Sequence, residues 1–140
     1  MKGSCLCGAV EYEVDRLAGP IVHCHCHTCQ KAHAAAYSST ARANRADFRW
    51  VRGESSVTSY ASSPGKRRHF CKRCGSQLIA EWTDEPQVIV RVATLDEDPG
   101  SKPVAHIWVS SAAPWLSDAP DTRSFPEFPP GFSATRGPAG

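Results

Sequence analysis

Short segments in which apolar and polar residues alternate recur along most of the chain, and they predict a β-rich fold. In the first of them, AVEYEV at 9–14, Val10, Tyr12 and Val14 share one face while the glutamates occupy the other. Valine occurs ten times and leucine five times, which also favours strands over helices. Proline- and glycine-containing breaks separate further alternating segments at 47–53, 56–62, 76–82, 88–95 and 105–110.

Helix-favouring sequence is confined to TCQKAHAAAY, where Thr28 can cap a short helix that continues to Ala36. From Pro114 onward the chain becomes rich in proline and glycine, and we expect it to follow the surface in extended form as far as Phe128 and then to lose order. The pattern thus predicts one mainly β domain with little helix over residues 1–128, followed by a Pro/Gly-rich C-terminal tail at 129–140.

The apolar content is low for a stable domain of this length. Leu, Ile, Val and Phe together make up 24 of the 140 residues. The net charge is only +2, so the high charge that accompanies disorder is missing. Bound metal is a natural additional source of stability, because forming a metal site contributes directly to the folding free energy.

Hydrophobicity and charge along the whole chain bear on its cellular location and on its binding partners. No apolar run reaches the roughly 18–20 residues that span a membrane, and MKGSCLCGAV lacks the apolar core of a secretory signal. We therefore expect a cytoplasmic protein with reduced thiols and no membrane partner. The basic run KRRHFCKR at 66–73 is expected to be a solvated face, which the near-neutral net charge favours over a nucleic-acid site.

Seven cysteines, an odd number, favour metal binding over a set of disulfides, since they cannot all pair. A structural zinc takes four ligands, so seven thiolates divide into four and three. A glycine directly follows Cys7 and Cys74 and lets the chain turn tightly around a metal. This shared feature predicts one group made of Cys5, Cys7, Cys71 and Cys74. The competing group of Cys26, Cys29, Cys71 and Cys74 needs a spacer of 41 residues, longer than a compact zinc ribbon has.

The remaining cysteines form the compact motif Cys24-x-Cys26-x-x-Cys29 within HCHCHTCQ. Three protein ligands and one open position are typical of catalytic zinc. If 23–28 is extended, the histidines of this stretch point away from the cysteines. His33, one helical turn after Cys29, is the best candidate to close the site as a fourth ligand. An open metal site, a site closed by histidine and the absence of a second metal thus remain as alternatives.

Three motifs in the same order make the chain similar to the glutathione-dependent formaldehyde-activating enzyme family: GSCLCGAVEY, CHCHTCQK and FCKRCGS. The later segment HIWVSSAAPW and the proline-rich run to Phe128 also resemble the end of that family's sequences. The resemblance covers about residues 2–128.

The resemblance implies a β-tent fold of short antiparallel sheets around two zinc ions per chain. It implies a structural zinc on Cys5, Cys7, Cys71 and Cys74 and a functional zinc on Cys24, Cys26 and Cys29. The implied activity is that of a carbon–sulfur lyase, which reversibly joins glutathione and formaldehyde into S-hydroxymethylglutathione. The implied partner is therefore a small thiol, glutathione or another, rather than a nucleic acid or a membrane.

The helix after Cys29 departs from the family pattern at Gln30, Ala34 and Ala35, where many relatives carry a basic residue after the cysteine and a glycine further on. These departures bear on the substrate more than on the metal. Glutathione has two carboxylates, and the nearest candidate cations in the sequence are Lys31, Arg42 and Arg49. The alternative function is a non-catalytic zinc module that binds a thiol metabolite or a protein partner.

Overall fold

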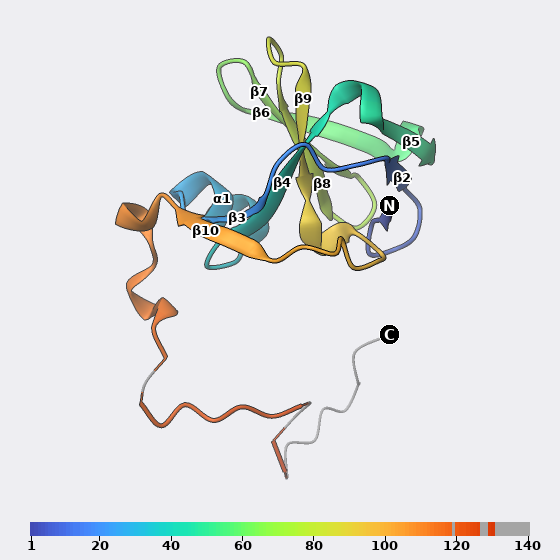
Figure 1. The fold of residues 1–140 in the computed structure, drawn as a ribbon. Helices are drawn as coiled ribbons and strands as arrows, with labels where there is room; N and C mark the ends of the chain where they lie inside the picture. The colour runs from blue at the N-terminus through green and yellow to red at the C-terminus, as the bar shows by residue number, and fades with distance from the viewer. Residues whose placement is uncertain (119, 127–128, 131–140) are drawn as a thin grey trace.

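The computed structural model describes residues 1–118, 120–126 and 129–130, and its secondary structure is mainly β (Figure 1). Its strands are β1 (Lys2–Ser4), β2 (Glu11–Val14), β3 (Ile21–Cys24), β4 (Ser38–Asn44), β5 (Phe48–Arg52), β6 (Val57–Ser63), β7 (Lys66–Cys71), β8 (Gln77–Trp82), β9 (Gln87–Arg91) and β10 (Pro103–Ile107). The α-helix of the described part is α1 (His27–His33), and no helix there is long and apolar enough to cross a membrane.

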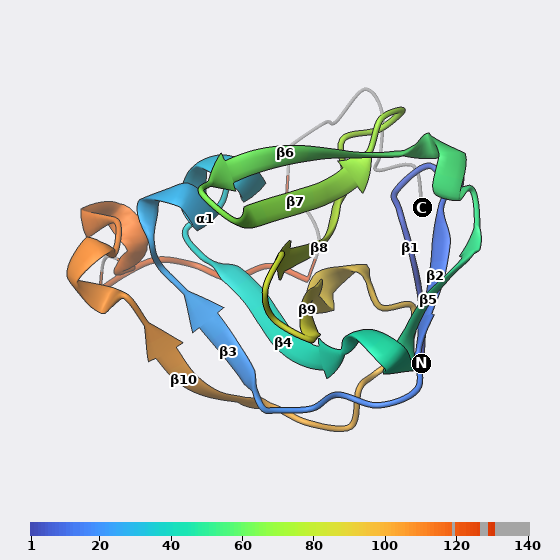
Figure 2. The same cartoon turned by 90° about the horizontal axis from the view of Figure 1, so that it is seen from above.

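The strands form two sheets. One has three strands in the order β1-β2-β5, and the other has seven in the order β10-β3-β4-β9-β8-β7-β6. Every pair is antiparallel except β10 with β3, which is parallel. Figure 2 shows that the seven-stranded sheet is strongly curved, with β6 and β7 at one side, β3 and β10 at the other, and α1 beside them.

The hydrophobic core lies between the two sheets and explains the alternation along the strands. Val88 and Val90 of β9 are fully buried and belong to the core. Tyr12 of β2 stacks on Phe48 of β5 with ring centroids 5.3 Å apart. Successive residues of a strand point to opposite faces, so Arg91 lies on the face of the large sheet that is turned away from this core. One face of the large sheet therefore builds the core, and the other is available for a site.

The predicted mainly β fold is confirmed, and six of the ten observed strands overlap the alternating segments. The strands at 2–4, 21–24, 38–44 and 66–71 were not predicted. In β4 the buried positions are Ser38, Thr40, Ala41 and Ala43, which are too small or polar to mark a strand by hydrophobicity. The predicted helix is wrong at both ends. The observed α1 begins at His27 with Cys26, not Thr28, as its N-cap, and it stops at His33, because Ala34 takes a left-handed conformation with φ 47°.

From residue 117 onward the chain is largely exposed where it is described, at 117–118 and 120–126. In Figure 1 this part leaves the sheets instead of following their surface, which differs from the prediction. The predicted loss of order after Phe128 lies outside the described residues except at Pro129 and Pro130. The boundary between domain and tail at residue 128 stays a prediction.

Candidate metal centres and their cavity

Cys5, Cys7, Cys71 and Cys74, called here the four-cysteine cluster, have sulfur atoms that all lie within 4.8 Å of one another. The Sγ atom of Cys7 is 3.6 Å from that of Cys5 and 3.9 Å from that of Cys71. In a tetrahedral zinc site with bonds of about 2.3 Å, the sulfurs are about 3.8 Å apart. The sulfurs therefore have the number and the spacing that such a metal requires.

The turns that present these sulfurs depend on the two glycines noted in the sequence. Gly8 and Gly75 have φ values of 67° and 79°, a left-handed backbone that glycine adopts without strain. The N–H of Gly8 donates to the carbonyl of Cys5 at 2.9 Å, and that of Gly75 donates to the carbonyl of Cys71 at 2.8 Å. The prediction that these glycines allow tight turns beside the cysteines is confirmed.

The four-cysteine cluster lies at the edge of the core, with two buried cysteines, a partly buried Cys74 and an exposed Cys7. Cys5 and Cys71 are 3% and 0% exposed and pack in the hydrophobic cluster between the sheets. Cys5 follows β1 of the small sheet, whereas Cys71 ends β7 of the large sheet. A metal held here would cross-link the two sheets.

Cys24, Cys26 and Cys29, called here the three-cysteine cluster, also have sulfurs that lie within 4.8 Å of one another. Cys24 ends β3, Cys26 is the N-cap of α1 and Cys29 is buried in the first turn of that helix. The Cys26 sulfur accepts a hydrogen bond from the Cys29 N–H at 3.4 Å. The strand end and the capped helix start therefore hold the three sulfurs together.

His33 does not close this site. No histidine among the described residues brings a ring nitrogen into the three-cysteine cluster. His33 instead lines a separate cavity of about 290 Å³ together with Arg91. Burial, together with the positive charges of Arg91 and Arg68, lowers the pKa of His33 to about 4. The position opposite the three sulfurs is therefore free of described protein ligands.

The histidines of HCHCHTCQ lie away from the sulfurs, as predicted. His25 is 2% exposed, and its Nε2 is 2.8 Å from Nδ1 of His106, a residue of β10. The Nδ1 of His23 is 3.0 Å from the Ser39 hydroxyl. The extended conformation expected for 23–28 is wrong at its end, because α1 already begins at His27. These contacts tie β3 to its two neighbouring strands.

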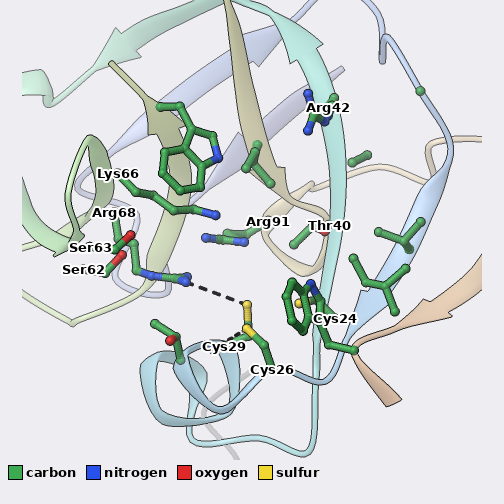
Figure 3. A pocket seen from close by; sticks show the side chains of 18 of the residues that line it. Cys24, Cys26, Cys29, Thr40, Arg42, Ser62, Ser63, Lys66, Arg68 and Arg91 are labelled. Atoms are coloured by element: carbon green, nitrogen blue, oxygen red, sulfur yellow. Dashed lines mark hydrogen bonds between the residues drawn. The ribbon is translucent and has the colours of Figure 1, made fainter. Parts of the chain in front are cut away.

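The three-cysteine cluster opens into a cavity of about 590 Å³ (Figure 3). Its walls come mainly from the large sheet, on the face opposite the core. The apolar lining residues are Val22, Trp82, Ile89, Ile107 and Trp108, and the hydroxyl-bearing ones are Thr28, Thr40, Ser62 and Ser63. The cavity therefore combines apolar walls with hydrogen-bonding groups, as small-molecule sites do.

Four cations line the same cavity, Arg42, Lys66, Arg68 and Arg91, and no carboxylate or histidine lines it among the described residues. Of the three cations expected from the sequence, only Arg42 is among them. Lys31 is exposed on α1, and Arg49 forms ion pairs with Glu13 and Asp15 on the small sheet. The cavity is thus more strongly cationic than the sequence indicated.

The expectation that KRRHFCKR is a solvated face is wrong for Lys66 and Arg68. This run forms β7, and alternate residues of a strand point to opposite sides. Arg68 is 4% exposed inside the cavity, and the Lys66 ammonium lies 4.6 Å from the centre of the Trp82 ring. Arg67 is exposed on the other side and donates to the Ser59 hydroxyl at 2.7 Å. A strand assignment for this run would have separated the inward cations from the outward ones.

Two arginines lie deep in the cavity. Arg68 donates from Nη2 to the Cys29 sulfur at 3.8 Å (Figure 3). Arg91 is 4% exposed, and burial together with the charge of Arg68 lowers the pKa of its guanidinium to about 10. Arg91 was not singled out in the sequence, and Arg68 was assigned to the solvated basic run. Both belong to strands that line this cavity.

Gln30, one of the departures from the family pattern, has a structural role. Its Nε2 donates to the carbonyl of His25 at 2.5 Å and to the carbonyl of Ser111 at 2.8 Å. The side chain therefore joins the first turn of α1 to the segment that follows β10. It does not line the cavity.

Comparisons with known proteins agree with these features. Residues 1–111 match the family described as glutathione-dependent formaldehyde-activating enzyme. A Halomonas elongata protein provisionally named a glutathione-dependent formaldehyde-activating enzyme is 29% identical over 128 residues, which cover 83% of this chain and 79% of that protein. An uncharacterised lyase of Schizosaccharomyces pombe is 31% identical over 86 residues, or 59% of this chain and 58% of the lyase. The crystal structure of a Rhodobacter sphaeroides protein is similar with a TM-score of 0.62 and 31% identity, covering 76% of this chain and 99% of that one.

Proposed function

Because the chain belongs to the glutathione-dependent formaldehyde-activating enzyme family, we propose that it is a zinc-dependent carbon–sulfur lyase. Its substrate is the adduct of a thiol with an aldehyde, such as S-hydroxymethylglutathione. The observation that carries this proposal is the three-cysteine cluster at the end of a cation-lined cavity of about 590 Å³.

In this proposal the two clusters would hold two zinc ions with different roles. The four-cysteine cluster supplies four thiolates at the edge of the core, the number that a closed structural zinc site takes. The three-cysteine cluster supplies three thiolates and leaves one position to the cavity. Zinc bound there stabilises the thiolate form of a sulfur ligand, which is the form that leaves when a carbon–sulfur bond breaks.

The cavity binds the rest of the substrate. A volume of about 590 Å³ is in the range that accommodates molecules of drug size, and a tripeptide thiol is of this size. Lys66 and Arg42 lie among its lining cations and are suited to pair with substrate carboxylates. Trp82, Ile89 and Val22 provide apolar walls that reduce the water around the reacting group.

The reaction breaks the carbon–sulfur bond of the adduct, returns the sulfur as a thiolate and leaves the carbon as an aldehyde after the adduct's hydroxyl loses its proton. The hydroxyls of Thr40, Ser62 and Ser63 line the cavity and are the groups that can hydrogen-bond the adduct's oxygen. The proton passes to water, since no carboxylate or histidine is among the described lining residues. The reverse direction joins the same thiol and aldehyde.

The lack of a carboxylate or histidine among the described lining residues also favours a second candidate, a non-catalytic zinc module that binds a thiol metabolite. Thiols add to formaldehyde without a catalyst, so such a module would only carry the thiol. All seven cysteines are unpaired, which suits a reducing compartment such as the cytoplasm for either function.

The test measures the formation and the breakdown of S-hydroxymethylglutathione by NMR, with and without the zinc-loaded protein. An enzyme accelerates both directions above the spontaneous rate, and the Cys29→Ser variant does not. Saturable glutathione binding without acceleration would instead support the binding module. Measured zinc well below two ions per chain would contradict the two-site arrangement.

A further inference from the structure

The cavity contains buried positive charge that its described residues do not balance. Arg68 and Arg91 are each 4% exposed. Arg42, by contrast, donates to the carboxylate of Glu85 at 3.2 Å. Within the described part of the chain, the Nε and Nη1 atoms of Arg68 and the Nε and Nη2 atoms of Arg91 are buried without a hydrogen-bond partner. Buried charges of this kind destabilise a fold unless an opposite charge lies beside them.

The register of the large sheet places both arginines on the face that lines the cavity of the three-cysteine cluster. Arg68 on β7 is opposite Ala80 on β8, and Ala80 is opposite Ile89 on β9. Arg91 lies two residues after Ile89 and therefore on the same face. In Figure 3 the guanidinium of Arg68 points to Cys29, and that of Arg91 lies between Lys66 and the cysteines. The opposite charge that these arginines need is therefore the metal–thiolate group.

A charge count shows what remains unbalanced. A divalent zinc with three thiolates carries one net negative charge. The two buried guanidiniums alone exceed it by one positive charge, to which the partly buried Lys66 adds, and an anionic fourth ligand lowers that excess by one. A neutral fourth ligand leaves the excess in a site where low water access strengthens the interaction between charges.

We propose that Arg68 and Arg91 are positioning residues that make the three-cysteine site select an anionic fourth ligand, a thiolate, over a neutral one. This inference rests on the proposed functional metal site and deepens it, because it assigns the choice of ligand to two residues that bind no metal themselves. It predicts that thiolates bind the site more tightly than neutral ligands of similar metal affinity.

The test uses the full chain with cobalt(II) in place of zinc, so that ligand binding changes the visible absorption. Dissociation constants are measured at one pH for glutathione, which offers a thiolate, and for imidazole, which is neutral. In Arg68→Gln and in Arg91→Gln we expect the preference for glutathione over imidazole to fall by about tenfold or more. Arg68→Lys and Arg91→Lys should recover part of it, since they restore the charge.

Arg49→Gln is the matched control, because it removes a guanidinium that pairs with Glu13 and Asp15 outside the cavity. It should leave the preference unchanged. A ratio of the two dissociation constants that stays the same in both cavity variants would overturn the proposal. A general loss of fold would weaken both ligands together, so it cannot imitate a change of the ratio.

If the glutamine variants do not fold, the proposal can still be tested by ligand binding to the unaltered protein. The affinity of azide relative to imidazole should then be higher for the cobalt form of the protein than for cobalt(II) in water, and an equal or lower ratio would overturn the proposal. Failure of the proposed function is separable from failure of this inference. A chain that binds no second metal rejects both, whereas metal-loaded protein with an unchanged ratio rejects only the role of the arginines. Absence of lyase activity leaves the ratio test intact.

Discussion

The two cysteine clusters use the same ligand atoms in opposite surroundings. The four-cysteine cluster lies against the core and joins the two sheets, with Cys5 and Cys71 almost fully buried. The three-cysteine cluster lies where a strand end meets a short helix and opens into a cavity of about 590 Å³. One cluster offers four sulfurs, whereas the other offers three and receives no fourth cysteine, histidine or carboxylate from the described part of the chain.

This difference shows that the number of cysteine ligands and the burial around them together determine the role of each cluster. A set of four thiolates against the core would stabilise the fold on binding a metal and has no open position for a substrate. A set of three thiolates has an open fourth position, and the buried cations beside it favour an anionic ligand there. The predictions below test how far this contrast between the clusters holds.

The largest effect is expected from Cys71→Ser, which removes a fully buried ligand of the four-cysteine cluster. A structural zinc contributes on the order of 10 kcal/mol to folding, about as much as the whole stability of a typical domain. We therefore expect the variant to be unfolded at room temperature, as measured by circular dichroism and metal analysis. A folded variant that retains both metals would contradict the structural role.

The matched change in the other cluster is Cys29→Ser, which also replaces a buried cysteine. Here we expect a folded chain that has lost one zinc and its activity on the thiol adduct, because the cluster lies beside a cavity and not in the core. Thermal unfolding and metal content measure both effects. If this variant unfolds as completely as Cys71→Ser does, the two clusters do not differ in role.

A smaller effect is expected from Gln30→Ala, which removes the hydrogen bonds to the carbonyls of His25 and Ser111. The two carbonyls lose their donor, and we expect a loss of about 1–3 kcal/mol in the free energy of unfolding. Urea denaturation of the metal-loaded protein measures it. Lys31→Ala, at the next and exposed position of α1, serves as the control and should have the stability of the parent chain.

The smallest effect is expected from Lys66→Gln, which removes a cation from the cavity wall but no metal ligand. We expect KM for the glutathione adduct to rise several-fold with little change in kcat, because the ammonium assists binding of a carboxylate. Arg67→Gln, on the outer face of the same strand, should behave like the unaltered protein. Equal KM values for the two variants would mean that Lys66 does not contact the substrate.

The sequence was sufficient to divide the cysteines, because spacing and the glycines after Cys7 and Cys74 are local features. The sequence was also sufficient to predict the strands in which large apolar residues alternate with polar ones. It did not indicate β4, whose buried positions are serine, threonine and alanine. Nor did it indicate that β10 pairs in parallel with β3, because a contact between segments some 80 residues apart leaves no local pattern.

The site was predicted only in part for a related reason. The cysteines of the cavity are adjacent in the sequence, whereas its deep cations come from β7 and β9, far from HCHCHTCQ. Proximity in sequence therefore selected Lys31 and Arg49, which lie outside the cavity, and missed Arg68 and Arg91. Assigning KRRHFCKR to a solvated face was wrong for Lys66 and Arg68, because a strand directs alternate residues to opposite sides.

The alternation along β9 has a consequence for how this fold can diversify. Val88 and Val90 hold the core, while Ile89 and Arg91 face the cavity. The cavity-facing set can therefore change to admit another thiol or a larger aldehyde while the core-facing set, and with it the folding stability, is inherited intact. A shift of one residue in the register would exchange the two sets and place a guanidinium in the core. Evolution or a laboratory library can thus vary the ligand by substitution at these positions, but not by insertion within the strand.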